Sequence, residues 1–280
     1  MAGTPKARAL GRALRQARED KKLTRRELGA KLNRDHGVIS RWETAERTPR
    51  PDQVAQLLTV LGVNGERYDE IIALAYDNGE PSWVATTVAA QRQQLTAYVD
   101  LVEKATRIVQ VEPLLVPGLL QTDGYIRAVM ADGLPPDESA ARTAIRVGLR
   151  AVLKRPELTA YLALIGEAAL YQQVGGPDVL RDQLRYLIAS ARHPKVELRI
   201  LPFRTDWHPA LDGPFVIVDA ERSRPMVHLE GRTQSLLVSD AAVVTEYQRA
   251  AERVCEVALT AEESIAYIVH NSRQDGEDAR

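Results

Sequence analysis

The sequence predicts two domains of different class, a mainly α N-terminal domain of five short helices and an α+β C-terminal domain. Apolar side chains recur at helical spacing in five segments as far as Ala75. From Trp83 onward the pattern changes to a longer helix, followed by strand-like segments among helices of unequal length. A length of 280 residues suits two domains. We therefore place the domains at residues 1–78 and 79–272, and we expect the polar tail, 273–280, to be disordered.

The first, fourth and fifth helices of the N-terminal domain each show a regular apolar face. Leu10 and Leu14 lie one turn apart in the first helix, which ends at the basic pair Lys21–Lys22. The fourth helix follows the i, i+3, i+4, i+7 rule, and the fifth repeats this spacing before the turn at 78–81. Their apolar positions are Val54, Leu57, Leu58 and Leu61 in the fourth and Tyr68, Ile71, Ile72 and Ala75 in the fifth.

Residues 23–49 predict two short helices joined by a tight turn. Thr24 followed by Glu27 is a capping box, which marks the start of the first of these helices, and Asp35 is the expected N-cap of the second. The polar segment 33–35 separates them. Their inward apolar positions are Leu28 and Leu32 on the first and Ile39 and Trp42 on the second. A helix pair of this kind is typical of DNA-reading domains.

The uneven distribution of charge along the chain supports this interpretation. Residues 1–50 hold 14 Lys or Arg against 6 Asp or Glu, whereas residues 51–280 hold 23 against 32. The formal net charge of −1 therefore hides a basic N-terminal part and an acidic remainder. A basic cluster beside such a helix pair is the electrostatic pattern of a domain that contacts the phosphate backbone of DNA.

The C-terminal domain mixes strands with helices of unequal length. This arrangement favours an α+β fold over a regular doubly wound sheet. The expected helices run from about Trp83 to Arg107, from about Asp137 to Lys154 and from about Pro177 to Ala191, with two more that close the chain near Ser272. The expected strands lie in RIVQVEP, LTAYLALI, VELRILPF, PFVIVDAE, PMVHLEG and SLLVSD.

Nearly the whole chain resembles known regulators. Residues 10–62 resemble the lambda-repressor-like, xenobiotic-response-element family of helix-turn-helix domains, through LTRRELGAKL followed by ISRWETAERTP. The remainder resembles the large C-terminal domain of WhiJ-like regulators, also described as Scr1-type antitoxin-like regulators, in EPLLVPGLLQTDGY, VGGPDVLRDQLRYL, VELRILPF and HPALDGPF. This resemblance implies regulation of transcription, often beside a gene for a small partner protein. It implies no residue roles in the C-terminal domain.

The resemblance also implies which residues read bases. The second helix of the pair would lie in the major groove, with its N-terminal residues against base edges. Arg41 is the first choice, because its planar guanidinium can bond guanine O6 and N7 together. His36 and Ser40 share the outward face, and His36 could instead touch phosphate or have no DNA contact. Gly37 stands where a polar residue is more usual, costs the helix about 1 kcal/mol relative to Ala, and could let the backbone come closer to DNA.

Other basic residues have different implied roles. The resemblance makes Arg25 and Arg26, at the start of the first helix of the pair, and Arg47, after the second, contacts to DNA phosphate. Arg18 and Glu43 occupy positions where the family commonly pairs an arginine with a glutamate. We interpret that pair as structural, since it would tie the first helix to the end of the reading helix.

The C-terminal domain carries no recognised catalytic signature. The motifs G-x-S-x-G, H-E-x-x-H, paired C-x-x-C, the P-loop and G-x-G-x-x-G are all missing. The densest polar cluster is Asp206, Trp207, His208 and Asp212, which could do acid–base chemistry or hold a metal. The prolines and glycine around it favour a structured loop, a candidate for binding an effector or partner. The lone Cys255 excludes an internal disulfide framework.

We therefore expect a sequence-specific DNA-binding regulator that is not an enzyme and needs no cofactor or metal. It should bind an inverted repeat in double-stranded DNA as a homodimer, because two-fold protein symmetry matches palindromic half-sites. The C-terminal domain should bind a small-molecule effector or a small partner protein encoded nearby. No apolar run approaches the roughly 18 residues of a membrane span, so we expect a cytoplasmic protein. The alternatives are an antitoxin-like component whose body mainly dimerises or binds a small partner protein, and a DNA-tethered enzyme.

Overall fold

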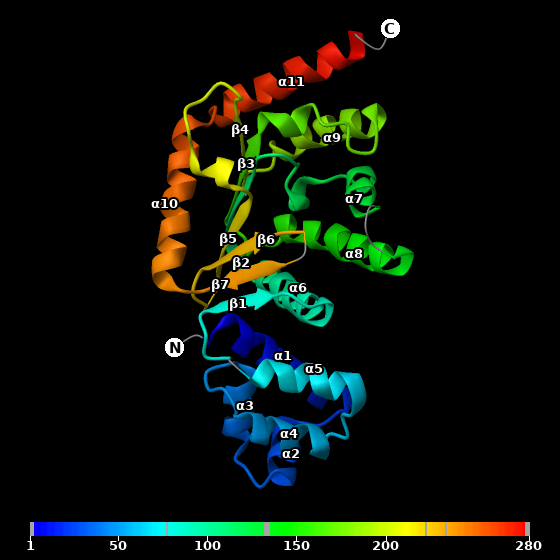
Figure 1. Ribbon diagram of the computed structural model, residues 1–280, viewed down its shortest axis with the longest axis vertical. Helices are drawn as coiled ribbons and strands as arrows, with labels where there is room; N and C mark the ends of the chain where they lie inside the picture. The colour runs from blue at the N-terminus through cyan, green and yellow to red at the C-terminus, as the bar shows by residue number, and fades with distance from the viewer. Residues whose placement is uncertain (1–2, 77, 132–134, 222, 233, 278–280) are drawn as a thin grey trace. The chain divides into compact units, whose positions relative to one another are not determined.

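The computed structural model describes residues 3–76, 78–131, 135–221, 223–232 and 234–277 (Figure 1). The chain divides into two compact units. The N-terminal unit comprises residues 1–100 with 222–243, and the C-terminal unit comprises residues 101–221 with 244–280.

The N-terminal unit begins with the five helices that the sequence predicts. Each presents its apolar face to one shared core, in which Leu10, Leu28 and Leu58 are fully buried. The inward positions Ile39 and Trp42 belong to the same core, as predicted. The helices are α1 (Pro5–Asp20), α2 (Arg25–Lys31), α3 (His36–Glu43), α4 (Pro51–Val60) and α5 (Gly65–Ala75).

Local hydrogen bonds fix the ends of α2 and α3. Thr24 and Glu27 form the predicted capping box at the start of α2, and the Asp35 side chain caps α3 by accepting from the Gly37 N–H. The end of α2 is a Schellman turn. Asn33 adopts a left-handed conformation with φ 52°, and the Arg34 N–H donates to a carbonyl inside the helix. The tight turn is therefore specified by residues next to it in sequence.

The segment after α5 differs from the single long helix that we expected from about Trp83 to Arg107. It begins as a strand, β1 (Ser82–Ala85), and only then becomes α6 (Val88–Glu103). Two features account for the difference: residues 82–85 pair with a strand late in the chain, 235–238, so that their burial alternates, and the Thr87 hydroxyl accepts from the Ala90 N–H at the start of the helix.

Strand β1 makes the N-terminal unit larger than the predicted 1–78 domain. Trp83 is buried in the same core as the five helices. Strand β1 pairs antiparallel with β7 (Ser235–Val238), which pairs antiparallel with β6 (Met226–Glu230). Gln94 of α6 is fully buried, donates to the Trp83 carbonyl over 2.5 Å and accepts from the Ser235 hydroxyl. A hairpin from late in the chain therefore supports a helical domain at its start.

The C-terminal unit is a mixed sheet flanked by helices, which confirms the α+β prediction. Its strands lie in the order β5-β2-β3-β4, with β2–β3 and β3–β4 parallel and β2–β5 antiparallel. Helices α7, α8 and α9 lie on one side of this sheet and α10 on the other (Figure 1). The elements are β2 (Ala105–Glu112), α7 (Asp123–Met130), α8 (Pro136–Leu149), β3 (Ala160–Gly166), α9 (Pro177–Ser190), β4 (Val196–Leu201), β5 (Phe215–Ala220), α10 (Ala241–Val257) and α11 (Ala261–Glu277).

The end of the chain also differs from expectation. Helix α11 continues to Glu277, although we expected disorder from residue 273. Arg273 and Gln274 favour a helix, whereas Asp275 and Gly276 do not, so the extension adds residues to a helix that is already nucleated. Residues 278–280 lie outside the described part of the chain. No helix within that part is both long and apolar enough to cross a membrane.

The packing of Trp83 generates a stability prediction. We expect Trp83→Ala to lower the free energy of unfolding by about 3–5 kcal/mol, because it leaves a large cavity in the core of the N-terminal unit. Val84→Ala is the matched control, since Val84 lies on the same strand but is 55% exposed, and it should change stability by about 0.5 kcal/mol or less. Urea denaturation of the full chain, followed by circular dichroism, measures both. Equal midpoints for the two variants would contradict this packing role.

Candidate nucleic-acid interface

Helix α3 is held in place by close packing against α1. A Cβ atom added to Gly11 would lie 2.7 Å from the Trp42 carbonyl oxygen and 2.8 Å from that of Glu43. Only glycine allows the two backbones to approach this closely. The C-terminal end of α3 therefore packs directly against the α1 backbone, and this contact fixes the orientation of the helix and of its outward face.

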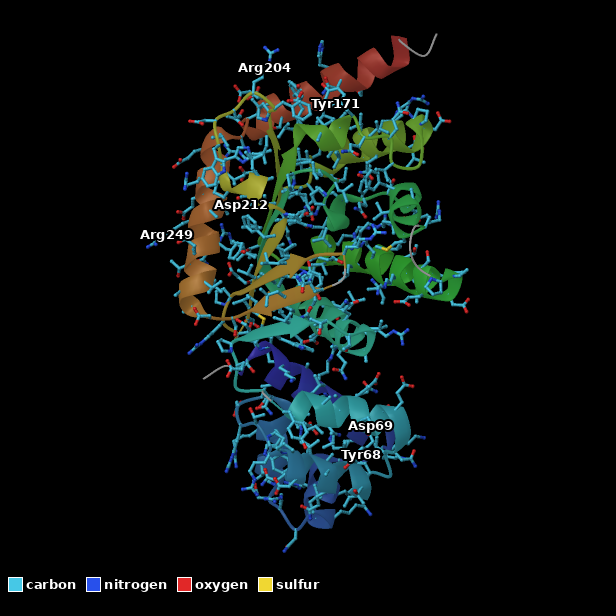
Figure 2. All side chains as sticks on the ribbon, viewed as in Figure 1. Tyr68, Asp69, Tyr171, Arg204, Asp212 and Arg249 are labelled. Carbon is cyan, nitrogen blue, oxygen red and sulfur yellow. The ribbon has the colours of Figure 1, made fainter. Side chains whose placement is uncertain are left out.

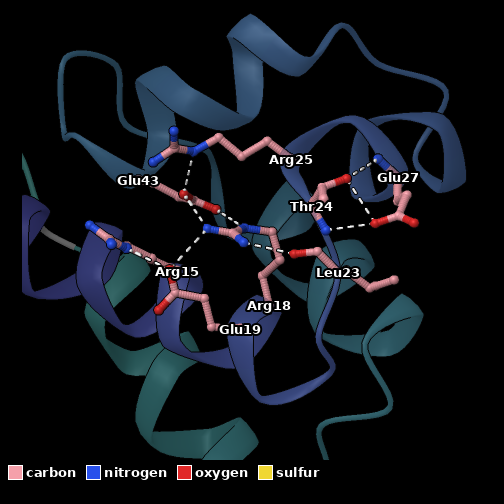
Figure 3. A network of polar contacts seen from close by, with 8 residues as sticks. All are labelled: Arg15, Arg18, Glu19, Leu23, Thr24, Arg25, Glu27 and Glu43. Atoms are coloured by element: carbon pink, nitrogen blue, oxygen red, sulfur yellow. Dashed lines mark hydrogen bonds and ion pairs between the residues drawn. The ribbon is translucent and has the colours of Figure 1, made fainter.

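An ion-pair network adds to this contact (Figure 3). Arg18 of α1 donates to both carboxylate oxygens of Glu43, from Nε over 2.6 Å and from Nη2 over 3.0 Å. Its Nη1 donates to the Leu23 carbonyl over 2.7 Å. The side chains of Arg18 and Glu43 are only 8% and 2% exposed. Hydrogen bonding to Glu43 raises the pKa of the Arg18 guanidinium. The structure thus contains the structural pair that the resemblance implies.

The network has a third member that sequence analysis missed. Arg25, the first residue of α2, donates from Nε to the Glu43 carboxylate over 2.8 Å (Figure 3). The resemblance implies only a phosphate contact for Arg25. No sequence signal indicates this contact, because the partners are 18 positions apart and lie on different helices. The Arg25 side chain remains 40% exposed, so its terminal nitrogens can still reach an anion while Glu43 orients the group.

The N-terminal end of α3 is organised by Asp35. One carboxylate oxygen accepts from the Gly37 N–H over 2.7 Å, and the other lies 3.4 Å from the Nδ1 atom of His36. The His36 side chain is 54% exposed. Arg41 is also exposed and Ser40 is partly exposed. The predicted base-reading residues therefore share the outward side of α3, while Ile39 and Trp42 point into the core.

The remaining basic residues of this region fall into two groups. Arg34, in the turn between α2 and α3, lies over the Trp42 ring with 5.3 Å between the guanidinium carbon and the ring centroid. This contact was also missed from sequence. Arg26 and Arg47 are exposed, and in the part of the chain described by the structure their side chains make no ion pair. These two are therefore available to bind phosphate.

The predicted C-terminal loop residues do not converge on one point. The Asp206 carboxylate accepts from the Trp207 N–H, and the exposed Trp207 ring lies 5.1 Å from the Arg253 guanidinium carbon. His208 is buried, its Nδ1 has no hydrogen-bond partner among the described residues, and burial lowers its pKa. Asp212 ends the short helix η4 (Pro209–Asp212; Figure 2). Within the described residues no group of three His, Cys, Asp or Glu could hold a metal. The arrangement is that of a structured loop.

A buried carboxylate elsewhere in the C-terminal unit was not singled out from sequence. Glu167 follows β3 and accepts from the Phe203 N–H over 2.7 Å and from the Tyr267 hydroxyl over 2.5 Å. Burial raises the pKa of Tyr267. Tyr171, labelled in Figure 2, stacks on the Phe203 ring with 6.2 Å between centroids. Glu167 thus joins the end of β3 to the segment after β4 and to α11, and both its oxygens are used in doing so.

Comparison with known proteins assigns both parts of the chain to families. A family model described as a helix-turn-helix domain matches residues 9–71, and one described as a domain of unknown function (DUF5753) matches residues 95–270. Multiprotein-bridging factor 1 of Candida albicans is 40% identical over 55 residues, which are 20% of this chain and 36% of that protein. The protein of the same name from Debaryomyces hansenii is 37% identical over 54 residues, or 19% and 36%. The chain thus spans about a third of the length of these curated relatives.

Solved structures are similar to the chain at a low level. One of them is that of TrmBL2, described as an archaeal chromatin protein with a novel mode of DNA binding. The TM-score is 0.32 at 16% sequence identity, over 73% of this chain and 60% of that one. This score is too low to establish a common fold.

The Glu43 network generates a second stability prediction. Arg18→Ala should destabilise the protein by about 3 kcal/mol, because it leaves the buried Glu43 carboxylate with Arg25 as its remaining partner. Arg15→Ala is the matched control from the same helix, since Arg15 makes an exposed i,i+4 pair with Glu19 that should contribute less than about 0.5 kcal/mol. Thermal and urea unfolding of both variants test this. An Arg18→Ala protein as stable as the control would show that the pair contributes nothing to folding.

Proposed function

Because the chain belongs to the family that shares the DUF5753 domain and carries a helix-turn-helix domain ahead of it, we propose that it is a sequence-specific DNA-binding regulator of transcription. Its reading element is then α3, within a helix-turn-helix domain of the xenobiotic-response-element type. The C-terminal unit, of the WhiJ-like or Scr1-type antitoxin-like class, serves as an effector- or partner-binding module. The protein acts in the cytoplasm, without a cofactor and without catalysis of its own.

One observation carries this proposal. The C-terminal end of α3 is held by the buried Glu43 network. Its outward face carries His36, Ser40 and Arg41, whose side chains can donate hydrogen bonds. A helix-turn-helix reads DNA in this way, with a rigidly held second helix whose N-terminal half faces base edges. Arg26 and Arg47 flank that face with uncommitted positive charge suited to phosphate.

Two copies are needed for useful specificity. A single helix of eight residues contacts few base pairs, and a two-fold dimer doubles the number of bases read. We therefore propose that the protein binds as a homodimer to an inverted repeat in double-stranded DNA.

Selection of duplexes from a random pool by the full chain, followed by footprinting, tests the DNA-binding role. We expect an inverted repeat with half-site centres about one helical turn, or a multiple of it, apart. Arg26→Ala should weaken binding to the selected site and to random duplex alike, and should reduce the salt slope by about one. Arg67→Ala is the control, because Arg67 lies on α5 in an exposed pair with Asp20.

Two results would contradict this role. The first is a pool that emerges without a shared sequence, because it would show that the protein does not discriminate between bases. The second is a protection pattern limited to one half-site by a single copy, which would remove the homodimer while leaving sequence-specific binding intact.

The C-terminal unit supports a binding role because its strands β5, β2, β3 and β4 form a mixed sheet with helices on both sides, far more than dimerisation requires. We expect an effector or small partner protein to bind it and to change operator affinity. The test is a thermal-shift screen of the full chain against metabolites and the products of neighbouring genes, followed by operator binding with each hit. A hit can shift this equilibrium only if it binds the DNA-bound and free forms with different affinity.

The alternatives give different results in the same screen. A partner that binds tightly but leaves operator affinity unchanged would favour the antitoxin-like alternative, in which the body mainly binds that protein or dimerises. Turnover of a metabolite would favour the DNA-tethered enzyme. If a protein in which a plain coiled coil replaces residues 101–221 and 244–280, with 222–243 retained, regulates the same genes in the same way, the module has no input role.

A further inference from the structure

We infer that Gly37 is a specificity-determining position, which acts by allowing the guanidinium of Arg41 to lie at the N-terminal end of α3. This inference rests on the proposed function and deepens it, since it says how α3 places a guanidinium group that can recognise guanine. Gly37 is a positioning residue in this scheme, and Arg41 is the group that contacts the base.

The spacing of the two residues places them together. Gly37 is the second residue of α3, and Arg41 lies four residues later, so both occupy the same side of the helix. Long side chains on a helix point back toward its N-terminus. The Arg41 guanidinium follows this rule: a Cβ atom added to Gly37 would lie 3.4 Å from its Nη1 atom. The side chain has folded back by about one turn, over the Gly37 backbone.

This position matters because of where a reading helix meets DNA. The N-terminal residues of such a helix approach the base edges, and the Cα of Arg41 lies roughly 6 Å further along the helix axis than that of Gly37. With the folded-back side chain, the guanidinium lies beside the position that a Cβ atom of residue 37 would take, 3.4 Å from it. The base contact that a polar side chain at position 37 would make is therefore made by Arg41, whose planar guanidinium can donate to guanine O6 and N7 together.

The guanidinium is also left free for a ligand. An acidic residue at this end of the helix is Asp35, whose Oδ1 atom lies 2.7 Å from the same added Cβ and accepts from the Gly37 N–H. Within the residues that the structure describes, Arg41 forms no ion pair with Asp35 or any other carboxylate. Asp35 therefore holds the backbone of Gly37 while the donors of Arg41 stay uncommitted.

A side chain at position 37 would disturb both neighbours but not the fold. At 2.7 Å the Asp35 carboxylate must move, and at 3.4 Å the Arg41 guanidinium is at the limit of ordinary van der Waals contact, so it shifts by a few tenths of an ångström. Both contacts are the far ends of flexible side chains, so the backbone need not shift. Gly37→Ala should accordingly fold like the wild type and still lose the placement of Arg41.

A double-mutant cycle on the full chain tests the inference. The ligands are the selected operator and the same operator with the symmetric base pair read by Arg41 exchanged. Arg41→Ala should reduce discrimination between them, an effect of roughly 5- to 150-fold for a bidentate contact. Gly37→Ala should reduce it by a factor smaller than that of Arg41→Ala, because it displaces the guanidinium without removing it, and binding to random duplex should be unchanged. Gly37→Ala/Arg41→Ala should behave like Arg41→Ala alone.

Asp35→Ala is the matched control for the cap, because it removes the bond to the Gly37 N–H without adding an atom beside Arg41. It should leave discrimination at that base pair largely intact. If it reproduces the loss seen in Gly37→Ala, or if the Gly37 and Arg41 effects multiply, Gly37 does not position Arg41 and the inference is wrong while the regulator role stands. A wild-type protein that selects no operator would overturn the proposed function itself, and this inference with it.

Discussion

The buried carboxylate of Glu43 is the interaction on which the rest of the N-terminal unit depends. A charge with 2% exposure must be paired, and it is paired twice, by Arg18 from α1 and by Arg25 from α2. Since Glu43 is the last residue of α3, three helices are joined at one point. The close packing of Gly11 against the same end of α3 prevents α1 and α3 from shifting relative to each other at this joint. The position of every side chain on the outward face of α3 follows from this joint.

The same joint changes how the basic composition should be interpreted. Residues 1–50 carry eight more basic than acidic groups, yet these groups are not equivalent. The Arg18 side chain donates to Glu43 and to a backbone carbonyl. Arg25 donates from Nε to Glu43, and the Arg34 guanidinium lies over the Trp42 ring. Arg26 and Arg47 are exposed and form no ion pair with any residue that the structure describes. A net charge indicates that phosphate is a suitable partner, but only the contacts show which arginines hold the domain together.

Features set by neighbouring residues were predictable from the sequence, and features set by distant ones were not. The five helices, the capping box at Thr24 and the cap at Asp35 depend on residues within four positions, and the structure has all of them. Trp83 was assigned to a helix because a strand of four residues carries almost no periodic signal, and its partner β7 lies some 150 positions later. The contact of Arg25 with Glu43 could not be predicted for the same reason, since it joins residues that lie far apart in the sequence, on two different helices.

Gly37 is the place where the local rules of helix formation are broken. Glycine is the poorest helix former after proline, and here it stands in the first turn of an eight-residue helix that has little propensity to spare. A sequence shaped only by stability would place alanine or a polar residue there. Conflicts of this kind, between local preference and the structure that the chain adopts, are expected where function requires them. The cap from Asp35 and the joint at Glu43 offset the weakness of α3 at its two ends. The helix can therefore carry a glycine at its reading end, because its geometry is fixed from outside rather than by its own propensity.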